Sequence, residues 1–142
     1  MKVSARNVFK GQISALTDGA VNAEVELTTA GGDTLIAIVT EGSVKSLGLA
    51  VGKDVIAYVK APWVMLVTGE GEVRFSARNQ LQGKVSQLNP GAVNTEVGIR
   101  LAGGMEVFSI ITNEAVSEMG LAVGVEASAL IKASHVILGV PA

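Results

Sequence analysis

The chain has 142 residues, a formal net charge of -2 and no cysteine. The lack of cysteine excludes disulfides, zinc–thiolate sites and iron–sulfur clusters, and a single histidine removes most other metal and acid–base sites. A nearly balanced charge provides no basic field for nucleic acid or for an anionic membrane surface.

Hydrophobic residues make up 49% of the chain, and the mean hydropathy is +0.47. Small domains cannot bury so many apolar residues by themselves. The sequence has no run of the roughly 20 apolar residues that a membrane span requires, and Met1–Asn7 has no apolar signal region. We therefore expect a soluble cytoplasmic protein, with no membrane partner, that buries apolar surface between subunits.

An internal repeat organises the chain. Ser4–Asn7 recurs 72 residues later as Ser76–Asn79, and the same offset aligns four further segments without a gap. Repetition at one fixed spacing is typical of a duplicated domain. We predict two domains, residues 1–70 and 71–142, joined by the short polar stretch Thr68–Glu72.

Each half is predicted to form short strands in the same order. Alternating apolar and polar residues in Val21–Leu27 predict a half-buried strand, and the continuous apolar run Leu35–Val39 predicts a strand buried on both faces. A short helix follows, capped by Thr40 and ended by Gly48. The predicted strands are 7–16, 21–27, 35–39, 55–60 and 63–67, with repeats that include 93–99, 107–111, 127–132 and 135–140.

Five strands and one helical turn in about 70 residues define the expected fold class. It is all-β, with two tandem OB-like five-stranded Greek-key barrels, each with one short helix. Paired glycines, as at Gly31-Gly32, are expected in the hairpin turns.

Catalysis finds little support in the sequence, and we expect that the protein is not an enzyme. His135 occupies the position that Trp63 fills in the first half, which indicates a packing or rim residue rather than a base. Glu24 and Glu96 recur in both halves, but they lie on the polar side of a strand, where carboxylates are commonly solvated or paired across strands.

Two recurring segments are rich in hydrogen-bond donors and contain no acidic residue. Hydroxyl, amide, ammonium and backbone N–H groups all donate, so a cluster of them suits a ligand that only accepts, which is an oxyanion. The donor segments are Ser4, Ala5, Arg6 and Asn7 with Lys60, Ala61 and Pro62, and Ser76, Ala77, Arg78 and Asn79 with Lys132, Ala133 and Ser134.

The same residues carry a family resemblance that covers essentially the whole chain. Ser-Ala-Arg-Asn followed by Gly11 or Gly83, then Gly-Ala-Val-Asn-x-Glu-Val, a Gly-Leu-x-x-Gly turn and Lys-Ala-Ser-x-Val resemble the Mop domain of the molbindins. Two such domains in one short chain resemble the tandem, ModG-type members of that family. The resemblance implies a homotrimer that binds molybdate or tungstate where domains of different subunits meet, with no organic cofactor.

The resemblance also assigns roles to the donor segments. Ser76–Asn79 is expected to face Lys132–Ser134 across a subunit interface, and the arginines are expected to contribute backbone N–H groups. Pro62 departs from the pattern, because proline has neither a hydroxyl nor an N–H. A second class of site near the trimer axis is expected at Gly19, Ala20, Val21 and Asn22, and at Gly91, Ala92, Val93 and Asn94.

Two other classes of function stay open at this point. An OB barrel also serves as a single-stranded nucleic-acid binder, but stacking aromatics are scarce here, at 4% of residues. An oligomeric regulatory or scaffold module is the other alternative to storage and buffering of the anion.

Overall fold

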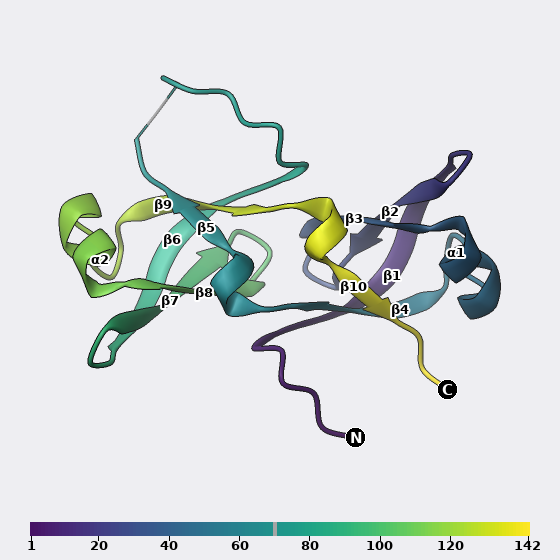
Figure 1. Cartoon of the computed structure of the whole chain (residues 1–142), viewed down its shortest axis with the longest axis horizontal. Helices are drawn as coiled ribbons and strands as arrows, with labels where there is room; N and C mark the ends of the chain where they lie inside the picture. Colours follow the sequence, from purple (N-terminus) through teal and green to yellow (C-terminus); the bar gives the residue numbers. More distant parts are fainter. Residues whose placement is uncertain (70) are drawn as a thin grey trace.

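The computed structural model describes residues 1–69 and 71–142. They form two curled, five-stranded antiparallel sheets that lie side by side, with one short helix at each outer end of the molecule (Figure 1). The predicted all-β class with two repeats is confirmed. Glu70, inside the predicted linker, lies outside the described residues.

The first sheet has the strand order β10-β4-β1-β2-β3. A register shift between Ile13 and Ala15 marks a bulge in its long first strand, and bulges of this kind increase the curl of a sheet. Its strands are β1 (Asn7–Asp18), β2 (Asn22–Thr28), β3 (Thr34–Thr40), β4 (Asp54–Val59) and β10 (Ile137–Gly139).

The second sheet repeats this arrangement in the order β5-β9-β6-β7-β8. The equivalent bulge lies between Val85 and Gln87. Its strands are β5 (Met65–Val67), β6 (Asn79–Pro90), β7 (Asn94–Leu101), β8 (Glu106–Thr112) and β9 (Glu126–Ile131).

The short last strand of each half belongs to the sheet of the other half. Met65 of β5 pairs with Leu130, and Ile137 of β10 pairs with Tyr58. In Figure 1 the teal β5 lies beside β9 of the second sheet, and the yellow β10 lies beside β4 of the first sheet. The prediction that each half closes with its own last strand is wrong. The turn before β5 packs on β8 of the second half, so the chain passes from the first sheet to the second at this point.

The short helices have the predicted caps. In α1 (Glu41–Leu47) the hydroxyl of Thr40 accepts from Ser43 N, and Gly48 ends the helix with a φ of 62°. The equivalent caps of α2 (Asn113–Met119) are Thr112 and Gly120. Positive φ favours glycine because glycine has no Cβ.

One continuous hydrophobic core runs through both sheets and includes buried residues of each half. The prediction of strands buried on both faces holds for β8, where Val107, Phe108 and Ser109 are all buried, but not for β3. In β3, Leu35 is buried while the neighbouring Ile36 is only half-buried, so the strand alternates.

The two halves also touch at their hairpin turns. A Cβ on Gly31 would overlap the carbonyl oxygen of Gly103, so the two backbones are in direct contact there. Asp33 fixes this contact, because its carboxylate accepts from Gly103 N at 3.0 Å and from Met105 N at 2.9 Å. The crossed strands and the touching turns together join the halves at several points.

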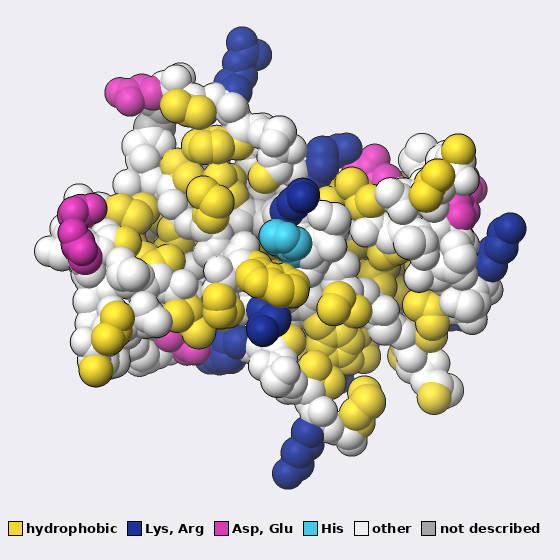
Figure 2. Space-filling view, viewed as in Figure 1, with side chains coloured by type: hydrophobic (Ala, Val, Ile, Leu, Met, Phe, Trp, Pro, Cys, Tyr) yellow, Lys and Arg dark blue, Asp and Glu magenta, His cyan; other side chains and the backbone are white. Residues whose placement is uncertain are grey.

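Exposed apolar side chains occur at repeat-equivalent positions, and yellow groups are spread over the face seen in Figure 2. Three equivalent pairs are exposed by more than half: Val21 and Val93, Val51 and Val123, and Met65 and Ile137. No helix in the described ranges is long and apolar enough to cross a membrane.

Candidate functional site

The sheet ladders bring the predicted donor segments together within each half. The ladder between β6 and β9 ends where Asn79 pairs with Ile131, and the next residues outward are Arg78 and Lys132. The ladder between β1 and β4 ends in the same way at Asn7 and Val59. Each Ser-Ala-Arg-Asn segment therefore meets the Lys-Ala segment of its own half where the two strands leave the sheet.

The two asparagines of these segments fasten the halves together. Asn7 is 1% exposed; its amide donates to Phe108 O at 2.8 Å and accepts from Phe108 N at 2.7 Å. Asn79 makes the same pair of bonds to Ile36 O and Ile36 N, each at 2.7 Å. Both amide side chains form hydrogen bonds with the backbone of an edge strand of the other half. The prediction that these amides donate to an anion does not fit these contacts.

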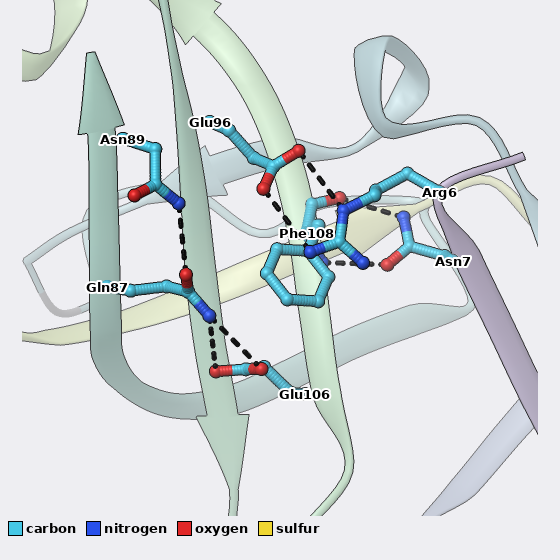
Figure 3. A network of polar contacts seen from close by, with 7 residues as sticks. All are labelled: Arg6, Asn7, Gln87, Asn89, Glu96, Glu106 and Phe108. Atoms are coloured by element: carbon cyan, nitrogen blue, oxygen red, sulfur yellow. Dashed lines mark hydrogen bonds and ion pairs between the residues drawn. The ribbon is translucent and has the colours of Figure 1, made fainter.

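The two arginines have acidic partners, contrary to the expectation of donors without carboxylates. Arg6 donates from Nε and Nη2 to the carboxylate of Glu96 at 3.2 and 3.3 Å, with its guanidinium 3.5 Å from the ring centroid of Phe108 (Figure 3). Arg78 forms an ion pair with Glu24. The guanidinium groups are therefore directed to carboxylates of the other half. The expected role of the arginine backbone N–H groups stays a prediction from the resemblance.

Exposed donors do remain in both segments. Ser4, Ser76, Lys60, Lys132 and Ser134 are all exposed, whereas Ala61 and Ala133 are buried. Lys60 precedes the short 3₁₀ turn η1 (Ala61–Trp63), and Lys132 precedes the equivalent turn η2 (Ala133–His135), which contains Ser134.

The two turns lie against each other at the centre of the molecule. The rings of Trp63 and His135 are 4.9 Å apart and tilted by 39°, which fits the predicted packing role of His135. The ammonium of Lys60 lies 5.5 Å from the centroid of the Trp63 ring. The turns do not begin strands as predicted; the strands start two residues after each ring.

A hollow of about 380 Å³ lies beside Ser134. Its polar wall comes from Asn22, Thr40 and Ser43 of the first half, and its apolar wall includes Ile38 and Leu138. The structure thus brings Ser134, from the first predicted class of site, close to Asn22, from the second class.

The second class of site has fewer free donors than expected. Gly19 N donates to the carboxylate of Glu41 at 3.2 Å, and Gly91 N donates to Asn94 O at 2.7 Å. Val21 and Val93 are among the most exposed apolar residues. This class stays a prediction, with two of its backbone N–H groups already in use.

The carboxyl group of Glu106 has a pKa below its ordinary value. The hydroxyl of Ser86 donates to its carboxylate, and this bond is the main cause that lowers the pKa of Glu106, against the opposing effect of burial. The amide of Gln87 and the charge of Arg100 lower the pKa further. Figure 3 shows this carboxylate below Gln87, away from the Arg6–Glu96 pair.

Replacing Glu106 by glutamine should change how stability depends on pH. Because the pKa of Glu106 is lowered in the folded protein, the charged form stabilises the fold above the ordinary glutamate pKa, and this contribution is lost as the pH falls. We expect Glu106→Gln to lower the free energy of unfolding by about 1 kcal/mol near pH 7. The difference should shrink below about pH 4.3.

Urea denaturation at several pH values measures this difference. Glu118→Gln, at an exposed position of α2, is the matched control and should show no such dependence. A Glu106→Gln effect that grows in acid would contradict the lowered pKa.

Over residues 1–69 and 71–142, no group of three or more histidine or acidic side chains is placed to hold a metal ion. Serine and lysine side chains offer exposed donors near two partly exposed arginine–glutamate pairs.

Sequence reasoning missed the role of Glu24 and Glu96. Each was expected to be solvated or paired across its own sheet, but each binds an arginine of the other half. A usable signal existed, since both members of both pairs recur at the same 72-residue offset. The oxyanion segments themselves stay a prediction, because their residues are placed but not shown to bind.

Comparison with known proteins defines the class. The TOBE domain model matches residues 3–66 and again 76–138. The chain therefore belongs to the TOBE domain family, with two domains in tandem, and the resemblance stated from its motifs is confirmed.

The most informative solved relative is the cytoplasmic molybdate-binding protein ModG in a molybdate-bound form. It is 60% identical with a TM-score of 0.93, and the match covers 99% of this chain and 100% of that one. The chain is also similar to the molybdenum-pterin-binding protein MopA of Rhodobacter capsulatus, 45% identical over 99% of this chain and 53% of MopA. The molybdenum transport protein ModE of Azotobacter vinelandii is 42% identical over 99% of this chain and 52% of ModE.

The chain spans about half the length of the curated relatives that it matches. The similarity therefore concerns the tandem TOBE part of those proteins.

Proposed function

We propose that this chain binds molybdate or tungstate reversibly and serves to store and buffer the anion in the cytoplasm, without catalysing a reaction. The observation that carries the proposal is the full-length match to ModG, which is 60% identical and was solved with molybdate bound. The exposed donors of Ser76, Lys132 and Ser134, gathered at one end of a ladder, support it.

The chemistry of the donors suits a fully deprotonated anion. Molybdate carries no proton at neutral pH, so every oxygen accepts a hydrogen bond, whereas phosphate retains a proton that needs an acceptor. The carboxylates of Glu96 and Glu24 are engaged with Arg6 and Arg78. A pocket of donors leaves the phosphate P–OH unpaired and so disfavours phosphate.

The proposed assembly is a homotrimer with anions at the subunit interfaces. The support comes from three pairs of exposed apolar residues at equivalent positions of the repeat, such as Val51 and Val123. Exposed apolar surface that recurs in both halves is suited to burial against other copies of the chain. Sites shared between subunits would link anion binding to assembly.

Molybdate should raise the melting temperature of the protein, and phosphate should not. At about 100 times the dissociation constant a ligand stabilises the folded state by about 2.7 kcal/mol, which corresponds to roughly 5 to 10 °C for a chain of this size. Differential scanning fluorimetry measures the shift, with sodium phosphate at equal ionic strength as the control. Equal shifts with both anions would reject the donor pocket.

Equilibrium dialysis against molybdate, followed by elemental analysis, tests the function itself. We expect bound molybdenum in a fixed ratio to protein that does not rise further with excess anion. Absence of retained molybdenum would reject the proposed function.

A further inference from the structure

Two carboxylates lie beside the proposed oxyanion segments, although carboxylates repel anions. Glu24 of β2 contacts the guanidinium of Arg78, and Glu96 of β7 binds Arg6 at 3.2 and 3.3 Å. Both pairs join opposite halves, and both repeat at the 72-residue offset. An exposed ion pair adds little stability, so its presence in both repeats calls for another explanation.

The carboxylate of Glu24 needs the positive charge of Arg78 beside it. Its Oε1 atom is buried and has no hydrogen bond within the described part of the chain, and it meets Arg78 Nη1 as an ion pair. A buried carboxylate oxygen needs a compensating charge. The guanidinium of Arg78 is therefore held on Glu24.

Each of these arginines lies next to a lysine of the proposed oxyanion site. Arg78 directly precedes β6 and Lys132 directly follows β9, where Asn79 pairs with Ile131. Arg6 and Lys60 flank β1 and β4 in the same way. With the arginine neutralised, each segment presents one lysine to a dianion. A free guanidinium would add a second positive charge, and its planar fork binds sulfate and phosphate as readily as other tetrahedral oxyanions.

We infer that Glu24 and Glu96 determine the anion selectivity of the proposed sites by binding Arg78 and Arg6 in neutral pairs. The inference rests on the proposed function. A paired arginine attracts dianions of every kind less strongly. The directed hydrogen-bond donors and the size of the site then decide which anion binds.

Glu24→Gln and Glu96→Gln test this role, because they release the arginines while retaining side chains of similar size. We expect the affinity for sulfate to rise roughly threefold to tenfold from one uncompensated charge a few ångströms away. The ratio of molybdate to sulfate affinity should fall, and binding should become more dependent on salt. A residue with a purely structural role would instead lower both affinities together.

Equilibrium dialysis with radiolabelled sulfate and with molybdate, on the full chain, supplies the measurement. Glu26→Gln removes the same charge from the same strand at a residue that binds Ser14, and it should leave the affinity ratio in place. In the double variant Glu24→Gln, Arg78→Gln, the additional sulfate binding should disappear, because the released cation is gone.

The outcomes separate the inference from the proposed function. An unchanged ratio in Glu24→Gln and Glu96→Gln, or an equal change in Glu26→Gln, overturns the inference. Failure of the unaltered chain to bind molybdate overturns the proposed function. In that case the Glu24→Gln variant would still bind sulfate through the released arginine, and the double variant would not.

Discussion

Asn7→Ala is expected to lower the free energy of unfolding by about 2 to 4 kcal/mol, because it removes two hydrogen bonds and leaves both backbone groups of Phe108 unpaired. Asn7 is 1% exposed, so water cannot readily replace its amide. Urea denaturation followed by circular dichroism measures the loss.

The control for this prediction is Gln12→Ala in the same strand. Gln12 is exposed and its amide donates to Asp54 at 3.1 Å, so its removal should change stability by no more than about 0.5 kcal/mol. A loss below about 1 kcal/mol for Asn7→Ala would contradict the view that this amide fastens β1 to β8.

Lys132→Ala is expected to weaken molybdate binding by roughly 10- to 100-fold, because a hydrogen bond to a charged group contributes about 1.5 to 3 kcal/mol. Lys132 is exposed and stands beside Ser134, so its removal should not disturb the core. Equilibrium dialysis with elemental analysis measures the change.

The matched variants are Lys60→Ala and Lys84→Ala. Lys60 precedes Pro62, which supplies no N–H or hydroxyl, and its ammonium also lies near the Trp63 ring, so we expect a smaller effect. Lys84 lies in β6, opposite Glu126 and away from the donor segments, and its removal should have no effect. Undiminished uptake by Lys132→Ala would remove that lysine from the site.

The elements of the fold follow from local chemistry, which is why they were predictable. Alternation in β2, the threonine caps of both helices and the glycine at each helix end are set by residues within a few positions of each other. The pairing of β5 and β10 was not predictable in this way. Periodicity specifies that Met65–Val67 is a strand, but not which sheet edge accepts it.

The candidate site shows the same division between local and long-range information. The Ser-Ala-Arg-Asn and Lys-Ala segments were identified from the repeat, and the structure places them at the same end of a ladder. The partners of Arg6 and Asn7 lie in β7 and β8 of the other half. Donor type alone does not reveal a partner 90 or 101 residues away.

Strand β5 belongs to the sheet of the second half and β10 to the sheet of the first half, so neither repeat completes its own sheet. A fragment ending before residue 70 would retain an unpaired tail at Met65–Val67 and would lack the strand that borders β4. Such a fragment could complete its sheet by accepting the tail of another molecule. Duplication within one chain makes that exchange intramolecular, so it no longer depends on protein concentration.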